Sequence, residues 1–499
     1  MTHSNEFNMK KILVANRGEI ALRIMRTCNE MGIATVAIYS EADADSLFVK
    51  FADEAICVGP PPSAESYLRG DYIIEKALEL GVEGIHPGYG FLSENGEFAQ
   101  KVTDVGIKFI GPLPKSMAMM GDKLAAKAAV KKFNIPMVPG TEKAIDNPAE
   151  VVEIAKEIGF PILIKAAAGG GGKGMRIVEK EEELEEQIQM ATNEAKSAFG
   201  DGSVFIEKYV SSPRHIEIQV LADQHGNIVH LFERDCSIQR RHQKVIEEAP
   251  STVLTPELRK EMGECACDVA RACGYWGAGT VEFLYENGKY YFLEMNTRLQ
   301  VEHPVSELIT NLDLVEQQIK VARGEKLAFK QEDLSIHGHS IEVRVYAEDP
   351  ENNFLPDIGT LSTYRLPEGE GVRVDDSMEE GKQIPIYYDP MISKLIVWGA
   401  TREQAIERMI KAIDEYQIHG VETTLSFCRY AINHEAFRTG EFDTHFVSKH
   451  FDPKNYRYVK PEEEELAALI GAHLTAERKG RLFVGAKTEL PSAWELNRS

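Results

Sequence analysis

The N-terminal segment carries a strand–helix–strand pattern that constrains the fold more than any other feature. Residues 11–15 read KILVA, an amphipathic stretch begins at Glu19, and residues 34–40 read ATVAIYS. Two strands joined by one helix form a βαβ unit, which requires a parallel sheet with a right-handed crossover. Helix and strand patterns continue to IKFIG at 107–111, so we predict an α/β domain over residues 8–121. Its first turn, NRGE, lacks the G-x-G-x-x-G spacing of a dinucleotide site.

The length and charge of the chain exclude several classes of protein. A chain of 499 residues is too long for one core and suggests roughly two to four domains. The formal charge of −23 argues against nucleic-acid binding, because phosphate contacts need a positive surface. Since no apolar run approaches the roughly 20 residues of a membrane-spanning helix, we expect no membrane partner. The first ten residues lack the apolar stretch of a secretory signal, so we expect a cytoplasmic protein.

The seven cysteines are sparse for this length, which is typical of a reducing compartment. Cys265, Cys267 and Cys273 cluster in ELRKEMGECACDVARACG, a helical pattern. On a helix, Cys265 and Cys267 point about 200° apart. We therefore predict buried thiols at these positions rather than a metal site.

The middle of the chain combines strand patterns with a few helices. A helix is expected near Asp122, and residues 137–210 contain two apolar strands around a glycine run, a charged helix and SVFIEKYV. Strand patterns dominate residues 215–302, which also contain a helix at 256–273. A further helix is expected at 305–323.

The C-terminal part of the sequence contains two regions of different character. Residues 335–453 alternate strands such as SIEVRVYAE with the helix pattern TREQAIERMIKAIDEYQ, which indicates an α+β unit. The tail, residues 455–499, has helix signals from Pro461 to Gly480. Its apolar residues on one face are Leu466, Leu469, Ile470 and Leu474. That face is expected to dock either on the parent domain or on a partner subunit.

A run of glycines lies between two strand patterns. Residues 165–175 read KAAAGGGGKGM, with FPILI before and MRIV after. Dinucleotide and Walker loops both lead into a helix, whereas a strand follows here, and Lys173 precedes glycine instead of Ser or Thr. The remaining interpretation is a flap whose backbone N–H groups cover phosphates, with Lys165 as a point charge. A mobile hairpin tip without a ligand is the alternative.

The segment YYFLEMNTRLQVEHP has polar residues at every second position. They are Glu294, Asn296, Arg298, Gln300 and Glu302. In an extended chain these side chains share one face, and the alternative is an edge strand that faces solvent. Carboxylate and amide oxygens suit Mg²⁺ or Mn²⁺ at nucleotide phosphates, and the guanidinium suits an anion. We therefore expect a strand over 294–302 with a metal and anion site on its polar face.

Glu282, on the preceding strand, adds another carboxylate. An ideal two-residue turn at Asn287-Gly288 pairs Glu282 with Leu293 and leaves Glu294 on the opposite face. A three-residue loop with a bulge pairs Glu282 with Glu294. If both carboxylates bind metal, the second arrangement is required.

A basic cluster, RDCSIQRRHQKVIEEAP, places Gln239, His242 and Lys244 among arginines in an acidic protein. A solvated loop is one interpretation of this cluster. An anion-binding role is the other, and it is favoured by the phosphate and metal features found elsewhere in the sequence.

These motifs together resemble the biotin carboxylase family, the ATP-grasp component of biotin-dependent carboxylases, over residues 8–450. The segments that carry the resemblance are KKILVANRGEIALRI, HPGYGFLSEN, MGDKLAAK, KAAAGGGGKGMR, FIEKYV, RHIEIQV, ERDCSIQRRHQKVIEEAP and EMNTRLQVEHPVSE. The resemblance implies a multidomain α/β and α+β fold. Its parts are a Rossmann-like pre-ATP-grasp domain (8–121), an ATP-grasp domain (122–330) with a mobile glycine-rich lid at about 137–210, and a C-terminal α+β domain (335–453).

The family's activity is that of an ATP-dependent carbon–nitrogen ligase. ATP phosphorylates bicarbonate to carboxyphosphate, which releases CO₂ and phosphate, and deprotonated biotin captures the CO₂ at a ureido nitrogen. The resemblance gives ATP-binding roles to Lys123, Lys165, Gly171, Gly172, Glu207, Lys208, Tyr209, Val210, His215, Gln239, His242, Glu282 and Glu294. Among these, Lys123 and Lys165 contact phosphates, Gly171 and Gly172 close over them, and the segment FIEKYV is the adenine hinge.

The remaining roles implied by the resemblance concern metal, bicarbonate and biotin. Glu282, Glu294 and Asn296 hold two Mg²⁺ or Mn²⁺ ions; Lys244, Arg298, Gln300 and Val301 surround bicarbonate; Glu302 is the base; Arg344 stabilises the biotin enolate. Lys244, Arg298, Glu302 and Arg344 are thus the expected catalytic residues.

The resemblance also implies partners. No Ala-Met-Lys-Met biotinylation sequence is present, so biotin is expected on a separate biotin carboxyl carrier protein, with a homodimeric arrangement and a carboxyltransferase subunit. The final acceptor is left open among acetyl-CoA, as in fatty acid biosynthesis, propionyl-CoA and pyruvate. Two alternatives stand beside this hypothesis: another ATP-grasp ligase that forms an acyl phosphate, and an inactive scaffold subunit.

Overall fold

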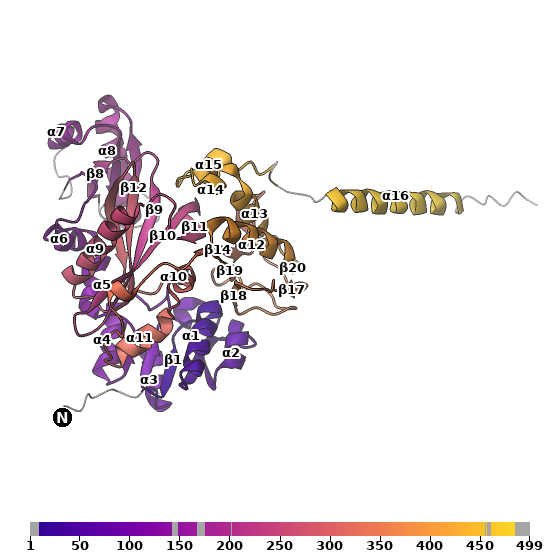
Figure 1. Cartoon of the computed structure of the whole chain (residues 1–499), viewed down its shortest axis with the longest axis horizontal. Helices are drawn as coiled ribbons and strands as arrows, with labels where there is room; N and C mark the ends of the chain where they lie inside the picture. The colour runs from indigo at the N-terminus through magenta and orange to yellow at the C-terminus, as the bar shows by residue number, and fades with distance from the viewer. Residues whose placement is uncertain are drawn as a thin grey trace, which may run out of the picture. The chain divides into compact units, whose positions relative to one another are not determined.

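The computed structural model describes residues 9–141, 148–166, 175–200, 202–454, 456 and 461–484. The chain divides into two compact units, Met1–Pro453 and Lys454–Ser499. The first unit contains a five-stranded, an eight-stranded and a three-stranded sheet, with two short two-stranded sheets (Figure 1). The predicted mixture of α/β and α+β architecture is confirmed.

The five-stranded sheet is parallel throughout and has the strand order β3-β2-β1-β4-β5. Its elements are β1 (Lys11–Val14), α1 (Gly18–Glu30), β2 (Ala34–Ser40), α2 (Leu47–Phe51), β3 (Glu54–Gly59), α3 (Gly70–Glu79), β4 (Gly84–His86), α4 (Gly96–Asp104) and β5 (Lys108–Phe109). The predicted βαβ unit is confirmed. The sequence prediction does not include α2 and β3; β3 is a short edge strand of six residues, and its first four residues are not buried.

The three-stranded antiparallel sheet has the order β7-β6-β8 and packs against two helices. Its elements are α7 (Pro148–Ile158), β6 (Ile162–Ala166), β7 (Arg176–Val178), α8 (Leu184–Phe199) and β8 (Val204–Lys208), and it is preceded by α5 (Pro114–Gly121) and α6 (Lys123–Lys131). The strands predicted on either side of the glycine run are confirmed, as is the helix expected near Asp122. The glycine run itself, with Gly171 and Gly172, lies outside the described residues.

The eight-stranded antiparallel sheet has the order β13-β12-β9-β10-β11-β14-β19-β18. Its strands are β9 (Arg214–Ala222), β10 (Ile228–Arg240), β11 (Gln243–Ala249), β12 (Gly277–Glu286), β13 (Lys289–Asn296), β14 (His339–Tyr346), β18 (Val372–Asp376) and β19 (Met391–Gly399). The pairing of β11 with β14 joins strands from the middle and C-terminal regions of the sequence (Figure 1). Backbone hydrogen bonds therefore run without interruption from one region into the other.

Helix α9 (Pro256–Ala272) agrees with the helix predicted at 256–273. The Thr255 side chain accepts from the N–H of Leu258, which satisfies a backbone donor in the first turn. Cys265, Cys267 and Cys273 are buried free thiols. The prediction of buried thiols is thus confirmed.

The helix predicted at 305–323 is wrong as a single element. The structure has α10 (His303–Thr310) and α11 (Leu314–Ala322). Asn311 takes a left-handed conformation with φ of 55°, which ends α10, and the Asp313 side chain accepts from the N–H of Glu316 to begin α11. Helix α10 packs across β10, β11, β14 and β19, so its N-terminus lies over the centre of the large sheet.

The strand predicted over 294–302 is also wrong in its extent, because β13 ends at Asn296. The last pair of the ladder is Thr280 with Asn296. The N–H of Thr297 then donates to the Glu94 carboxylate at 3.0 Å instead of to a neighbouring strand. Strict alternation of polar and apolar faces therefore stops before Glu302.

The β12–β13 hairpin has the register that was required for a shared metal site. Glu282 pairs with Glu294, and the register shifts between Glu282 and Phe283, so Leu293 is an extra residue in β13. The loop itself is the two-residue Asn287-Gly288 turn, with φ of 52° and 79°. The expected register is confirmed, but its cause is a bulge inside the strand and not a longer loop.

The C-terminal region completes the first unit with short elements around β19. They are β15 (Glu348–Asp349), β16 (Leu355–Pro356), β17 (Thr363–Arg365), α12 (Arg402–Glu415), β20 (Gln417–His419), α13 (Leu425–Asn433), α14 (Glu435–Thr439) and α15 (Phe446–His450). Helix α12 agrees with the predicted TREQAIERMIKAIDEYQ helix. An apolar core between this helix, α13 and the large sheet includes Ile406, Met409, Phe427 and Leu395.

The second unit contains one helix, α16 (Pro461–Val484), among its described residues. The predicted start at Pro461 is confirmed, whereas the helix continues past the predicted end at Gly480. Among the described residues, none of the helices combines the length and apolarity that crossing a bilayer requires.

The hairpin turn gives a test of how the register is fixed. Gly288 has φ of 79° and open space around the position of a Cβ, so a side chain there meets only backbone strain. Gly288→Ala should lower the free energy of unfolding by about 1 kcal/mol, measured by urea titration of tryptophan fluorescence. Gly121→Ala is the matched control, because Gly121 also has open space but lacks a positive φ. Equal unfolding midpoints for the two variants would contradict the assigned turn.

Candidate functional site

Four charged side chains form one row across the large sheet. Glu294 pairs with Glu282, Glu282 with Glu217, and Glu217 with Arg234, on the neighbouring strands β13, β12, β9 and β10. Directly paired residues of antiparallel strands point to the same side of the sheet. Glu217, Glu282 and Arg234 are buried, whereas Glu294 at the sheet edge is exposed.

Lys244 on β11 is the cation around which the carboxylates gather. Its Nζ donates to Glu282 Oε1 at 2.8 Å and to Glu302 Oε1 at 2.7 Å, and it also donates to Glu217. Burial lowers the pKa of Lys244, but the three carboxylates outweigh it and hold that pKa well above its usual range. Lys244 is therefore an ammonium in this site at any physiological pH.

Glu302, immediately before α10, bridges Lys244 and Arg344. Arg344 Nη2 donates to Glu302 Oε2 at 2.9 Å, and its Nε donates to Glu247 Oε1 at 2.7 Å. Burial raises the pKa of the Glu302 carboxyl, but Lys244, Arg344 and Arg234 together hold it well below its usual range. Glu302 is therefore an ionised carboxylate that faces two cations.

Arg234 is fully buried and organises the floor of the site. Its guanidinium donates to Glu217, Gln219, Ser306, Thr280 and Gln300, at 2.5 to 3.0 Å. The fork thereby ties β9, β12, the 297–302 segment and α10 together. A buried guanidinium with every direction satisfied is a rigid support for the groups above it.

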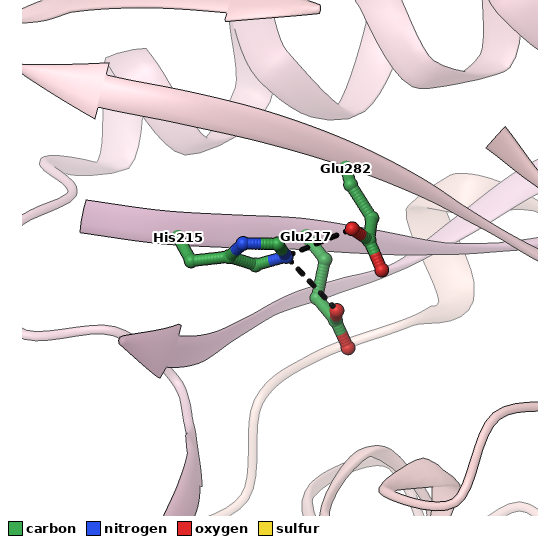
Figure 2. Close-up of side chains that lie close together, drawn as sticks. All are labelled: His215, Glu217 and Glu282. Atoms are coloured by element: carbon green, nitrogen blue, oxygen red, sulfur yellow. Dashed lines mark ion pairs between the residues drawn. The ribbon is translucent and has the colours of Figure 1, made fainter. Parts of the chain in front are cut away.

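His215 completes the carboxylate cluster from the next position along β9 on the same face. Figure 2 shows its ring directed at Glu282 and Glu217; Nε2 lies 2.9 Å from Glu282 Oε2 and 3.8 Å from Glu217 Oε2. Burial lowers the pKa of His215, but Glu282 reverses this and raises it above its ordinary value. The pKa of Glu282 is held well below its usual range by Lys244 and His215, in spite of burial.

The residues predicted as metal ligands fit a hard divalent cation. Glu282 and Glu294 are directly paired on neighbouring strands, and Asn296 donates from Nδ2 to Glu282 Oε1 at 2.9 Å. Carboxylate and amide oxygens at one sheet edge are the donors that Mg²⁺ and Mn²⁺ prefer. Ligand atoms of His215, Glu217 and Glu282 also lie within 4.8 Å of one another, a group that was not predicted as a whole.

Three residues that were predicted to bind bicarbonate lie after the end of β13 in the sequence: Arg298, Gln300 and Val301. Gln300 accepts from Arg234 at 2.8 Å and donates to Glu282 at 2.8 Å, which fixes the orientation of its amide. Arg298 is partly exposed and donates from Nε to Glu94 at 2.9 Å and from Nη2 to Asn296 at 3.0 Å. The structure therefore brings Gln300 to the buried cluster and leaves Arg298 at its mouth.

The backbone of Val301 is held by a lysine from the C-terminal region. Lys394 on β19 is completely buried, and its Nζ donates to the Val301 carbonyl at 2.8 Å. The same ammonium lies 3.4 Å from Glu19 and 3.7 Å from Asp375. The backbone of Val301 is thus fixed by a contact that joins three distant parts of the sequence.

The predicted adenine hinge lies at the end of β8 beside a cavity of about 200 Å³. The cavity is lined by Val138, Pro139, Lys208, Tyr209, Val210, Glu286, Asn287, Lys289 and Tyr291. The Glu207 carboxylate accepts from Lys165 at 2.6 Å and also from Lys127. Burial raises the pKa of Glu207, yet Lys165 and Lys127 keep it below its ordinary value.

The structure gives fewer contacts for the other residues that were predicted to bind the nucleotide, which are Lys123, Gln239 and His242. Lys123 is the first residue of α6, and its side chain lies outside the described part of the structure. Gln239 pairs with Lys244 across β10 and β11 and donates to the Cys236 carbonyl at 2.9 Å. His242 lies at the exposed β10–β11 turn with φ of 64°, apart from the carboxylate cluster.

Several charged groups in or beside the candidate site were not singled out from the sequence. They are Lys127, Glu217, Arg234, Glu247 and Lys394. The alternation in RHIEIQV places Glu217 on the same face as His215, which is a signal for Glu217. Arg234 and Lys394 gave no comparable signal, because most of their partners lie far away in the sequence.

Comparison with known proteins places three consecutive parts of the chain in known domains. Residues 8–117 match "Biotin carboxylase, N-terminal domain", residues 122–330 match "Carbamoyl-phosphate synthase L chain, ATP binding domain", and residues 342–449 match "Biotin carboxylase C-terminal domain".

Relatives of known name match at similar levels over most of the chain. Biotin carboxylase 1 of Bacillus subtilis is 52% identical over 88% of this chain and 98% of its own length. The mitochondrial propionyl-CoA carboxylase alpha chain of Homo sapiens is 51% identical over 99% of this chain and 69% of its own length.

A solved structure agrees in fold as well as in sequence. The biotin carboxylase domain dimer of Hydrogenobacter thermophilus 2-oxoglutarate carboxylase, in complex with MgADP, ADP and bicarbonate, is 49% identical, with a TM-score of 0.84 over 91% of this chain and 99% of that one. Because three domain models match in order, and relatives share about half of all residues along the chain, this protein belongs to the biotin carboxylase family.

Proposed function

We propose that this chain uses ATP and bicarbonate to carboxylate biotin. The observation that carries the proposal is the convergence of Lys244 and Arg344 on Glu302, beside the Glu282–Glu294 pair. An anion site next to a metal-capable carboxylate pair suits phosphoryl transfer to bicarbonate. The MgADP and bicarbonate in the similar Hydrogenobacter thermophilus domain support the same assignment.

The first step is the phosphorylation of bicarbonate. Lys244, Arg298, Gln300 and the Val301 backbone hold the anion, and Glu302 accepts its proton. As this proton leaves, a bicarbonate oxygen bonds to the γ-phosphorus and the bond from that phosphorus to ADP breaks, which gives carboxyphosphate. Glu302 is a weak base because of its cations, so proton transfer is expected to accompany P–O bond formation.

The second step is the transfer of CO₂ to biotin. Carboxyphosphate breaks into CO₂ and phosphate, and the phosphate takes the proton from the ureido nitrogen of biotin. The nitrogen then forms a bond to the carbon of CO₂. Arg344, fixed by Glu302 and Glu247, supplies the positive charge that stabilises the enolate oxygen of biotin.

The proposed metal and nucleotide sites use further residues of the candidate site. Glu282, Glu294 and Asn296 would hold two Mg²⁺ or Mn²⁺ ions, which neutralise charge on the transferred phosphoryl group. Lys123 and Lys165 would contact ATP phosphates, with His215, Gln239 and His242 nearby. The glycine run would cover the phosphates through Gly171 and Gly172, and residues 207–210 would line the adenine.

Partners and domain limits are proposed on the family relationship. Biotin arrives on a carrier protein, a carboxyltransferase subunit uses the product, and the chain forms a homodimer. The names of similar proteins support such an assembly, since they include a propionyl-CoA carboxylase alpha chain and the biotin carboxylase subunit of pyruvate carboxylase. Domains are proposed at 8–121, 122–330 and 335–453. The seven free cysteines support a cytoplasmic location.

ATP hydrolysis tests the proposed reaction directly. With Mg²⁺ present, the purified chain should hydrolyse ATP only when bicarbonate is added, and free biotin should raise that rate, measured as phosphate released. Glu302→Gln keeps the shape but cannot accept the proton, so it should lower the rate by about 10²- to 10⁴-fold. A rate of ATP hydrolysis that depends on neither bicarbonate nor biotin would contradict the proposal.

A variant of Arg344 distinguishes the second step of the reaction from ATP binding. Arg344→Ala should lower carboxybiotin formation by about 10²- to 10³-fold, because it removes the charge opposite the developing enolate. ATP binding, measured by calorimetry, should be unchanged, since Arg344 contacts neither Glu207 nor Lys165. Arg429→Ala, which removes a remote ion pair with Asp414, is the control. Lost ATP binding in Arg344→Ala alone would refute the assigned role.

A further inference from the structure

Two buried glutamates lie side by side next to Arg344, and the reaction described above does not use them as a pair. Glu247 on β11 pairs directly with Glu342 on β14, and each side chain has no exposed surface. Directly opposed residues of antiparallel strands have Cβ atoms about 4.5–5.5 Å apart. Two ionised carboxylates at that spacing repel each other, and burial strengthens the repulsion.

The hydrogen bonding of the pair is incomplete in a specific way. Glu247 Oε1 accepts from Arg344 Nε at 2.7 Å, whereas Glu247 Oε2 and both oxygens of Glu342 have no partner among the described residues. A buried carboxylate that accepts no hydrogen bond strongly disfavours its charged form. Three such oxygens on two opposed residues therefore indicate that the pair retains a proton.

The surrounding charges act on both members of the pair. Lys394 on β19, Arg344 on β14 and Glu302 act on Glu342, and Arg344, Glu302 and Lys244 act on Glu247. His303 follows Glu302 at the start of α10. Lys394 is already engaged by the Val301 carbonyl and lies near two other carboxylates, Glu19 and Asp375.

Lys244, Arg344 and Lys394 together do not offset the effect of burial on the pair. Burial raises the pKa of Glu342 well above its ordinary range, and burial also raises the pKa of Glu247 in spite of Arg344. His303 stays neutral, because burial and Lys394 lower its pKa well below its ordinary value.

We propose that Glu247 and Glu342 share one proton and act as a positioning pair that sets how strongly Arg344 is held away from biotin. With the proton present, the pair offers Arg344 one negative charge, matched by Glu302 on the other side of the guanidinium. When the proton leaves, a second negative charge draws Arg344 towards the pair. Its hold on the biotin enolate then weakens.

This inference rests on the proposed function for its kinetic consequence. Arg344 acts on biotin in the second step, so loss of the proton should slow biotin carboxylation more than it changes bicarbonate-dependent ATP cleavage without biotin. At pH values above the one at which the pair loses its proton, the biotin-dependent rate should fall about tenfold per pH unit, as for one essential protonated group.

A stability consequence is independent of activity. In the unfolded chain a glutamate has a pKa of about 4.3, and in the folded chain the pKa of Glu342 is raised. At pH values between the unfolded and the folded pKa, the folded chain binds one more proton than the unfolded chain does. The free energy of unfolding therefore falls as the pH rises through this range. A glutamine at position 342 has no proton to lose and escapes this fall.

The test compares wild type with Glu342→Gln in the full chain. The ratio of the biotin-dependent rate at pH 9 to that at pH 7 should be at least about threefold higher in the variant. Its apparent Tm relative to wild type should also rise from pH 6 to pH 9. Glu248→Gln is the matched control, because Glu248 is the buried neighbour of Glu247 and His339 and Arg402 lower its pKa to about 2 in spite of burial, so it has no proton to lose between pH 6 and pH 9 and should change neither readout. Glu342→Met serves as the second neutral variant if the first does not fold.

The outcomes separate the two proposals. If biotin-dependent activity is absent in wild type, the proposed function fails, and the Tm comparison still tests the acid pair. If the biotin-dependent rate changes by the same factor from pH 7 to pH 9 in Glu342→Gln and in wild type, the proposed positioning role is wrong. A Tm difference that is the same at pH 6 and pH 9 would overturn the shared proton.

Discussion

The buried ammonium of Lys244 is the interaction on which the rest of the site depends. It contacts Glu217, Glu282 and Glu302, which come from two strands and the start of a helix. Without this cation three carboxylates would face each other in a low-dielectric environment. Removing one partner of a buried pair typically costs about 3–5 kcal/mol, since the remaining charge is left uncompensated. The same positive charge that permits this crowding of carboxylates is available to hold a small anion.

Strand β11 explains how one sheet can bring together two kinds of chemistry. It pairs with β10 on one side and β14 on the other, so Lys244 and Arg344 belong to neighbouring strands. Helix α10 lies across these strands and delivers Glu302 between the two cations. In the proposed reaction, the phosphoryl-transfer site and the biotin site would therefore share one carboxylate, that of Glu302. We regard this sharing as the physical reason why the CO₂ released in one step can be used in the next.

Local patterns predicted much of the fold, and the misses have physical causes. The βαβ unit, α9 and α12 follow from periodicity and capping residues, which are local. The break at Asn311 depends on a backbone conformation that periodicity does not reveal. In the site, the pairing of Glu282 with Glu294 was one of two arrangements left open by the sequence, and the bulge at Leu293 that produces it could not be located. Arg234 and Lys394 were missed because most of their partners are distant in the sequence, such as Gln300, 66 residues from Arg234, and Val301, 93 residues from Lys394.

The central claim is that the Lys244–Glu302 site joins bicarbonate to the γ-phosphoryl group of ATP before biotin reacts. The most direct measurement uses bicarbonate labelled with oxygen-18 in the presence of Mg²⁺ and biotin, with mass spectrometry of the released phosphate. If bicarbonate oxygen attacks phosphorus, each phosphate should carry one labelled oxygen. Phosphate that gains label only when the water is labelled would show that water is the nucleophile and would contradict the account.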